Sequence, residues 1–275
     1  AASYNLARLG VERWDLALGS IVLLAWTLGG GLKALDQGIS ALGWPPLWSG
    51  VLFIVVLFSI NALIDLPLAA WRTFIVEARF GFNRTTPSAF IRDRLLGGLL
   101  MLLLGAPLVT ALLWLMTRAG ETWWLLAWLV WMTFTLSLTF IYPTWIAPLF
   151  NRFEPLQDTA LRSRLEGLLD RCGFRSDGMF VMDGSRRSTH GNAYFTGFGS
   201  HKRIVFYDTL LHGLDGDEVE AVLAHELGHF KRGHVRKRLL LSAATALAGL
   251  YLLGWLSRQA WFYQALGAET QSPAM

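Results

Sequence analysis

Residues 122–146 read TWWLLAWLVWMTFTLSLTFIYPTWI and contain no charged side chain. About 20 consecutive apolar residues are enough for a helix to cross the hydrocarbon core of a bilayer. Four further stretches are also mostly apolar and of similar length: Trp14–Leu35, Leu47–Trp71, Leu95–Met116 and Leu239–Leu256. The sequence therefore predicts a mostly α, polytopic membrane helix bundle with about five spans.

The overall composition excludes an ordinary soluble domain. Hydrophobic residues make up 53% of the 275 residues and charged residues only 16%, and the mean hydropathy is +0.41. The 13 Trp residues fit the same class, because Trp collects at membrane–water boundaries. Cys172 is the single cysteine, so no intrachain disulfide can form.

The positions of the basic residues predict an orientation. With five spans, all but three of the 24 Lys and Arg residues fall on one side, and the exceptions are Lys33, Arg118 and Arg258. Because positive charge accumulates on the cytoplasmic side of membrane proteins, we expect the polar segment before the last span to be cytoplasmic. The positive net charge is then a topology signal, and no nucleic-acid partner is expected. Short loops without eukaryotic targeting signals favour a bacterial inner membrane.

We expect three parts: a membrane domain with four helices (1–150), a catalytic segment (151–238), and a fifth membrane helix with its following loop (239–275). The catalytic segment is expected to be a small α/β unit, because helical and strand-like patterns alternate in it. The expected helices are Asp158–Cys172 and a second one from Asp215 to about Val235, and the expected strands are Met179–Met182, Asn192–Phe198 and Arg203–Tyr207.

The second of these helices contains His-Glu-Leu-Gly-His at residues 225–229. Positions i and i+4 project from one face of a helix, so His225 and His229 can bind one Zn²⁺ per chain. Glu226 is then placed to accept a proton from metal-activated water, as the general base of peptide hydrolysis. The alternative is a helix whose two histidines only cap or pair. The apolar residues upstream disfavour it, because polar side chains buried there need a specific partner.

A zinc peptidase uses three protein ligands and a water, and the third ligand is not evident. His234 lies roughly 140° around the helix from His229 and cannot easily reach the same ion. Glu269 carries no surrounding motif, and the remaining histidines, His190, His201 and His212, are expected on loops or turns. We therefore expect the third ligand beyond Met275.

Several stretches together resemble the membrane zinc metallopeptidases of the CAAX prenyl protease 1 type. They are Arg79–Thr86 (RFGFNRTT), Ile146–Leu156 (IAPLFNRFEPL), Asp183–Gly199 (DGSRRSTHGNAYFTGFG), Lys202–Leu210 (KRIVFYDTL) and Glu220–His229 (EAVLAHELGH). The resemblance covers residues 70 to 235 in family order, and it is far more specific than the zinc motif alone.

This resemblance implies seven membrane helices around a large chamber, with a zincin-like site at the chamber wall. His225 and His229 match the family's zinc ligands, and Glu226 matches its catalytic carboxylate. The family's third ligand, in a Glu-x-x-x-Asp pattern, has no match here. Five spans in place of seven predict a chain truncated at both ends. The eukaryotic members remove the last three residues after a prenylated cysteine.

Substrate binding is predicted at the strand that begins Asn192-Ala193-Tyr194, because an extended peptide can add to the edge of a sheet. Arg186 and Arg187 could pair with the terminal carboxylate of a substrate. The equally weighted alternative is a solvated basic loop. The lipid bilayer is the other expected partner, and no oligomeric state is predicted.

Three functions compete. The first is a zinc metalloendopeptidase that acts near the C-terminus of lipidated (CAAX-type) or membrane-associated peptides. The second is a quality-control peptidase that degrades misfolded membrane proteins with the same chemistry. The third is a catalytically silent membrane scaffold, which is favoured only if the third zinc ligand is absent.

Overall fold

The computed structural model describes residues 2–198, 201–231 and 233–265. The chain divides into two compact units, each described separately below. One consists of residues 1–80, 91–134 and 243–275, and the other of residues 81–90 and 135–242. The first is helical, and the second contains a sheet together with the helix that carries the His-Glu-x-x-His pattern.

Most of the chain is helical. The first helices are α1 (Ala2–Thr27), α2 (Gly31–Ser40), α3 (Pro46–Trp71) with its π-helical extension η1 (Arg72–Glu77), α4 (Pro87–Leu100), η2 (Met101–Gly105) and α5 (Ala106–Arg118). After the short η3 (Gly120–Thr122) come α6 (Trp123–Ile141), η4 (Tyr142–Ile146) and α7 (Ala147–Phe150), and near the end α11 (His234–Leu256) and α12 (Ala260–Ala265).

Among the described residues, four continuous helical segments are long and apolar enough to cross a membrane: Pro46–Glu77, Pro87–Arg118, Gly120–Phe150 and Arg236–Leu256. They confirm four of the predicted spans. The predicted span Trp14–Leu35 is not one straight helix, because α1 and α2 meet at a 53° bend. Gly30 lies in this bend with φ of 76°, a left-handed conformation that suits glycine. The bent pair counts as a fifth span only if it crosses the membrane as one unit.

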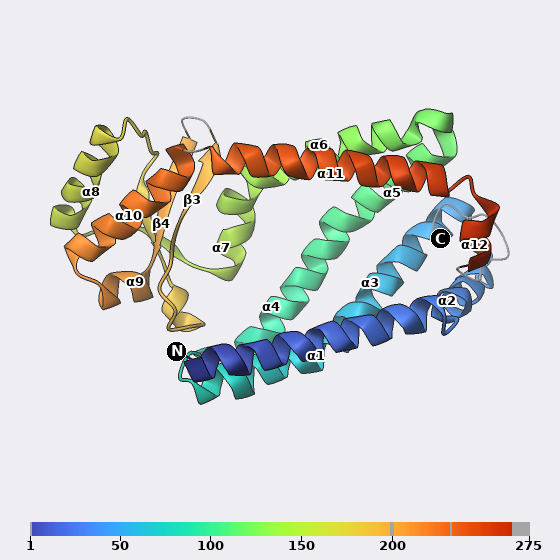
Figure 1. Cartoon of the computed structure of the whole chain (residues 1–275), viewed down its shortest axis with the longest axis horizontal. Coiled ribbons are helices and arrows are strands. Elements are labelled where there is room, and N and C mark those ends of the chain that lie inside the picture. Colours follow the sequence, from blue (N-terminus) through green and yellow to red (C-terminus); the bar gives the residue numbers. More distant parts are fainter. Residues whose placement is uncertain (1, 199–200, 232, 266–275) are drawn as a thin grey trace. The chain divides into compact units, whose positions relative to one another are not determined.

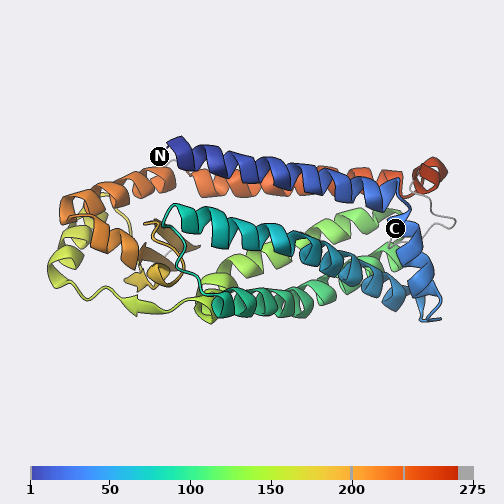
Figure 2. The ribbon, with the colours of Figure 1, turned by 90° about the horizontal axis from the view of Figure 1, so that it is seen from below.

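Helices within the first unit are joined by polar contacts as well as by packing. The indole of Trp26 on α1 donates to Oδ1 of Asn61 on α3 at 3.0 Å. The indole of Trp128 on α6 donates to the carbonyl of Ala243 on α11 at 2.9 Å. Helices α3 and α5 lie side by side (Figure 2). Large apolar side chains are exposed along these helices, as expected for surfaces that face lipid.

The second unit contains a four-stranded mixed sheet in the order β1-β2-β4-β3. Its strands are β1 (Phe153–Pro155), β2 (Met179–Met182), β3 (Ala193–Phe198) and β4 (His201–Tyr207). Strand β2 runs parallel to β4, while β1 and β3 are antiparallel to their neighbours. The register of β3 on β4 runs from Ala193 opposite Phe206 to Phe198 opposite His201, which leaves β3 at one edge of the sheet.

Helices α8 (Thr159–Arg171) and α10 (Gly216–Lys231) cover one face of this sheet, and the short helix α9 (Asp208–Gly213) precedes α10 (Figure 1). The core between them is completely apolar. Leu165 on α8, Phe206 on β4 and Leu223 on α10 are each fully buried in it. This burial stabilises the unit and holds α10 against the sheet.

The ends of the predicted helices and strands in this unit differ from the observed ends by at most two residues, with one exception. The helix predicted to run to about Val235 ends at Lys231, and α11 begins at His234. Gly233 lies between them with φ of +65°, which ends the first helix because a left-handed residue cannot continue it. Strand β1 was not predicted, because it is short and ends in a proline.

Candidate metal-dependent active site

The His-Glu-x-x-His pattern lies in the second half of α10, as predicted. The start of this helix is fixed by Asp215, whose Oδ1 accepts the backbone N–H groups of Asp217 and Glu218, each at 2.9 Å. The carboxylate of Glu218 in turn accepts the N–H of Asp215 at 3.0 Å. This reciprocal pair is a capping box, and it fixes the point from which the helix turns to its histidines.

The buried stripe of α10 consists of Val219, Leu223 and Leu227. At about 100° per residue, His225 lies roughly 200° around the helix from Leu223, on the side away from the core. The structure accordingly leaves His225 exposed and Glu226 half-buried, so the burial that the sequence predicted for these side chains is wrong for His225, which lies on the face of α10 away from the core. His229 is helical in its backbone, and its side chain lies outside the described part of the structure. The helix geometry places positions 225 and 229 on one face, which fits two imidazole ligands of one metal ion.

Two histidines at these positions are suitable ligands for a metal ion, but a third ligand is not identified. Among the described side chains, no group of three His, Cys, Asp or Glu lies close enough together to hold a metal ion. His190 stacks on Phe82 with ring centroids 4.3 Å apart, and His212 is in the last turn of α9. Glu269 and the side chains of His201 and His234 lie outside the described residues.

Strand β3, which contacts α10, begins at the predicted substrate-binding sequence Asn192-Ala193-Tyr194. The carbonyl of Asn192 accepts the N–H of Tyr207 at 2.9 Å, and its Oδ1 accepts the N–H of Ala193 at the same distance. The bond from Tyr207 continues the pairing with β4 one residue before the start of β3. The other edge of β3 has no paired strand among the described residues. Such an edge can take an extended peptide.

Tyr194 projects from β3 on the face away from α10. Its hydroxyl lies 4.0 Å from Sδ of Met182, and its ring meets Tyr207 edge to face at 6.2 Å. Burial raises the pKa of Tyr194 to about 12, and the nearby Tyr207 and Tyr142 add to the shift. The phenol is therefore neutral at physiological pH.

The two arginines before β3 have different surroundings. Arg186 is exposed and pairs with the carboxylate of Asp183 at 3.0 Å. Arg187 is half-buried, and its guanidinium donates to Oδ1 of Asn151 at 2.7 Å and to the carbonyl of Phe150 at 2.6 Å. Arg187 thus holds the residues that precede β1 against the loop that leads to β3.

Sequence reasoning missed a second set of contacts to this loop. The carbonyl of Phe82 accepts the N–H of Thr189 at 3.1 Å, and Asn83 forms an isolated antiparallel bridge with Ser188. The carbonyl of Arg187 accepts the N–H of Arg84 at 3.0 Å. The segment between α3 and α4 is therefore bound to the loop that leads to β3. No local pattern could have predicted this pairing across a hundred residues.

Helix α8 is also tied to the zinc-motif helix by an ion-pair network that the sequence did not indicate. Glu220 on α10 accepts hydrogen bonds from Arg164 and, at 2.8 Å, from Arg171, both on α8. Arg164 also pairs with Asp217. The hydrogen bond from Arg164 is the main cause of a lowered pKa of Glu220. The hydrogen bonds that Arg164 donates to Glu220 and Asp217 raise the pKa of Arg164 in turn.

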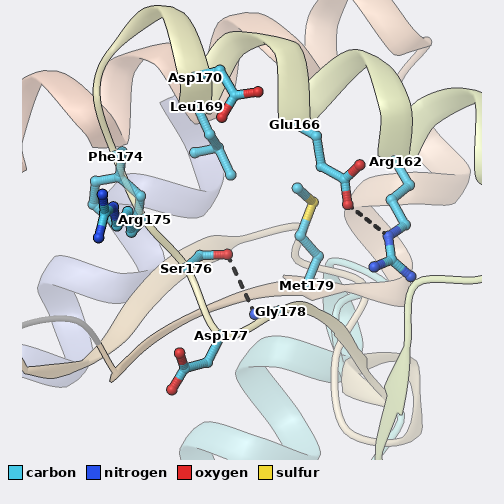
Figure 3. A pocket seen from close by; sticks show the side chains of 10 residues that line it. All are labelled: Arg162, Glu166, Leu169, Asp170, Phe174, Arg175, Ser176, Asp177, Gly178 and Met179. Atoms are coloured by element: carbon cyan, nitrogen blue, oxygen red, sulfur yellow. Dashed lines mark hydrogen bonds and ion pairs between the residues drawn. The ribbon is translucent and has the colours of Figure 1, made fainter.

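A cavity of about 600 Å³ lies between α8 and the start of β2 (Figure 3). Its wall includes an ion pair between Arg162 and Glu166 at 2.8 Å, and the N–H of Gly178 donates to the hydroxyl of Ser176. Acidic and basic side chains are mixed on its walls and no histidine lines it. The cavity lacks the ligands and the sheet edge that peptide hydrolysis needs, so we give it no part in the site.

Comparison with known proteins agrees with this geometry. Residues 1–152 match the model of the CAAX prenyl protease N-terminal region, with five membrane helices, and residues 155–269 match that of peptidase family M48. The CAAX prenyl protease 1 homologue of Dictyostelium discoideum is 37% identical over 217 residues, which are 78% of this chain and 51% of that protein. CAAX prenyl protease 1 of Saccharomyces cerevisiae is 37% identical over 218 residues, with coverages of 78% and 48%.

Among solved structures, Ste24p of S. mikatae superimposes with a TM-score of 0.90 at 30% sequence identity, over 96% of this chain and 63% of that one. Fold and sequence thus define a multi-pass integral-membrane protein with a metallopeptidase-type unit. The chain belongs to the M48 peptidases of the CAAX prenyl protease 1 type. It spans about half the length of the curated relatives it matches.

Proposed function

We propose that the natural protein is a membrane zinc metalloendopeptidase that cleaves peptides near the C-terminus of lipidated, CAAX-type or other membrane-associated substrates. The observation that carries this proposal is the position of His-Glu-x-x-His on α10, a helix that packs against the edge strand β3. Family membership supports metal-dependent peptide hydrolysis, and the names of the relatives support a prenylated substrate. The membrane-spanning helices support a substrate that is presented at the bilayer.

In this proposal His225 and His229 bind the metal, one ion per chain, and Glu226 is the catalytic carboxylate. A bound Zn²⁺ would polarise the substrate carbonyl and lower the pKa of a water molecule beside it. The half-buried Glu226 accepts the proton of that water at its carboxylate and delivers it to the leaving amine. The identity of the third ligand stays open.

The substrate backbone is proposed to lie along β3, antiparallel to it, beside Asn192, Ala193 and Tyr194. Main-chain hydrogen bonds would then hold the peptide whatever its sequence. Arg186 is exposed on the loop before β3, so its guanidinium can turn from Asp183 to the terminal carboxylate of a substrate. A direct role of Arg187 at that carboxylate stays a prediction, because both of its Nη atoms already donate to residues 150 and 151.

The orientation in the membrane is also a proposal. With five spans, all but three of the 24 Lys and Arg residues fall on the side of the α/β unit, which favours a cytoplasmic site. The relatives named above are eukaryotic, so the predicted bacterial inner membrane stays a prediction that they do not support.

The test is hydrolysis of three substrates by the zinc-loaded natural protein in detergent: a prenylated peptide, its unprenylated form and a misfolded membrane protein. Glu226→Gln should lower the rate by about 10²-fold to 10⁴-fold, the usual contribution of a general base. Glu166→Gln, on the exposed face of α8, is the matched control and should keep full activity. Equal rates for wild type and Glu226→Gln would refute the assignment of the base.

The pattern across substrates separates the competing functions. Preference for the prenylated peptide supports the proposal. Faster cleavage of the misfolded protein would favour a quality-control peptidase. If the folded, zinc-loaded protein cleaves none of the substrates, the third function, a catalytically silent membrane scaffold, is favoured.

A further inference from the structure

Helices α1 and α3 both belong to the first unit, and two polar contacts join them near their opposite ends. The hydroxyl of Tyr4 donates to Oε1 of Glu77 on η1 at 2.8 Å. The indole of Trp26 donates to Oδ1 of Asn61 at 3.0 Å. The beginning of α1 thus pairs with the end of the α3–η1 segment, so the two helices are antiparallel. The contacts hold the helices together on either side of the stretch between them.

An open apolar groove lies between the helices in this stretch. It has a volume of about 540 Å³, within the range of about 300–1,000 Å³ that is usual for small-molecule sites. None of the side chains that line it carries a charge. They come from both helices: Trp14, Leu18, Ile64, Pro67, Leu68 and Trp71. The part of a ligand that touches the groove must therefore be apolar.

The walls of the groove have two levels along the helix axes. Trp14 and Trp71 lie nearest to the Tyr4 contact, and they are the ends of two of the predicted apolar stretches. Leu18 is about one helical turn farther into its span than Trp14, and Ile64 is about two turns farther in than Trp71. Because Trp collects at membrane–water boundaries, the two tryptophans mark the level of the bilayer surface.

An arginine stands next to each of these tryptophans in the chain. Arg13 precedes Trp14, Arg72 follows Trp71, and both arginines are exposed. Within the part of the chain that the structure describes, neither guanidinium forms an ion pair or a hydrogen bond. Because a long basic side chain can extend from its helix to the membrane surface, both charges are available at the headgroup level.

The acidic side chains of this region do not cancel these charges at the groove. Glu12 and Glu77 each accept a hydrogen bond from another side chain, at 3.1 Å and 2.8 Å respectively. Asp15 and Asp65 are not among the residues that line the groove. The groove therefore combines an apolar wall, an aromatic level and two available cations, in that order from the middle of the spans outward.

We propose that this groove binds one phospholipid of the bilayer with an anionic headgroup. The proposal goes beyond the peptidase function and does not depend on it. One acyl chain lies along Leu18 and Ile64, the glycerol is at the level of the two tryptophans, and the phosphate meets Arg13 and Arg72. Guanidinium groups bind phosphate oxygens through paired, charge-assisted hydrogen bonds, and basic residues beside a span attract anionic lipids.

The two arginines decide between this occupant and other apolar molecules. A sterol or a free prenyl chain could also cover the apolar wall, but neither offers an anion at the level of Arg13 and Arg72. A zwitterionic phospholipid has a phosphate but also a positive group, which the arginines repel. The headgroup preference is therefore the property to measure.

The experiment is native mass spectrometry of the detergent-purified natural protein, mixed with equal amounts of phosphatidylglycerol and phosphatidylcholine that have the same acyl chains. One lipid per chain should be retained, and phosphatidylglycerol should be favoured by about fivefold or more, the usual effect of one basic residue near an anionic headgroup. Retention of neither lipid, or of both equally, would overturn the inference.

Variants locate the retained lipid. Arg13→Gln combined with Arg72→Gln should bring the ratio of the two lipids close to one, whereas Arg118→Gln, exposed at the end of α5, should leave it unchanged. Leu68→Trp fills the groove and should reduce the retention of both lipids. Leu99→Trp, at an exposed position of α4, is its matched control.

The arginine variant keeps the test decisive if Leu68→Trp does not fold, because both of its substitutions are at exposed positions. An unchanged preference for phosphatidylglycerol in this variant would mean that the lipid binds elsewhere, and the inference would be wrong. A farnesylated peptide in excess should leave the lipid bound. Displacement of the lipid by that peptide would assign the groove to a substrate and would also overturn the inference.

Discussion

Arg187 and Asn151 are joined by a hydrogen bond of 2.7 Å from the guanidinium Nη1 to Oδ1, across 36 positions of the chain. The same guanidinium donates to the carbonyl of Phe150, and the carbonyl of Arg187 accepts from the N–H of Arg84 and the hydroxyl of Thr85. Arg187 therefore connects three of the sequence stretches on which the family resemblance rests. It fixes the loop that leads to β3, the strand proposed to hold the substrate.

We predict that Arg187→Ala destabilises the α/β unit far more than Arg186→Ala. A hydrogen bond to a charged group contributes about 1.5–3 kcal/mol, and Arg187 makes two from a half-buried position. Arg186 makes an exposed ion pair with Asp183, which is worth about 0–1 kcal/mol. Thermal unfolding in detergent, followed by proteolytic cleavage within the α/β unit, tests the difference. Equal midpoints for the two variants would contradict the structural role of Arg187.

Local sequence patterns predicted the elements around this junction but not the junction itself. Apolar runs predicted the membrane helices, and alternating or helical spacing predicted β2 and α8 almost to the residue. The capping box at Asp215 explains why the start of α10 was also predictable. These signals are local, because each depends on residues within one or two turns or one strand.

Long-range contacts have no such local signal. Residues 81–86 were noted only for their resemblance to a family, and their pairing with Arg187 and Thr189 depends on the fold of the whole unit. The bend at Gly30 was missed for a different reason: apolar side chains continue on both sides of it, so hydropathy alone predicts one span.

The ion pairs between α8 and α10 predict a specific dependence of stability on pH. The folded protein holds the pKa of Glu220 below its ordinary value of 4.5, mainly through the hydrogen bond from Arg164. A carboxylate with a depressed pKa stabilises the fold above its ordinary pKa, and the stabilisation is lost as the pH falls through the lower folded value. Stability from this group should therefore be complete at neutral pH and decline below about pH 4.5.

Glu220→Gln removes the titrating group and keeps the shape of the side chain. We expect it to lower the unfolding temperature at pH 7 and to have little effect near pH 3, because the wild-type carboxyl is then losing its charge as well. The effect should be small, since Arg164 and Arg171 are largely exposed. Unfolding curves of wild type, Glu220→Gln and Glu166→Gln from pH 7 to pH 3 provide the test. A difference that grows toward low pH would contradict the sign.

Gly233 separates the zinc-motif helix from the membrane helix α11, and its φ of +65° predicts sensitivity to substitution. A side chain in the left-handed region costs about 1–2 kcal/mol, so Gly233→Ala should destabilise the fold by about that amount. Gly167→Ala is the control: it lies in the exposed interior of α8, where alanine should stabilise the helix by up to about 1 kcal/mol. Opposite shifts in the unfolding midpoint are expected, and a neutral or stabilising Gly233→Ala would argue against a required left-handed turn.

The metal itself provides the most direct test of α10. If His225 and His229 are ligands, the purified natural protein should contain close to one zinc per chain by elemental analysis, and His225→Ala should lose most of it, because a site with one imidazole fewer binds the ion far more weakly. His212→Ala removes a histidine from the end of α9 and should keep the zinc, which shows that any loss is specific to the helix motif. Retention of zinc by His225→Ala would mean that the ion is bound elsewhere, and the assignment of α10 as the metal-binding helix would then be wrong.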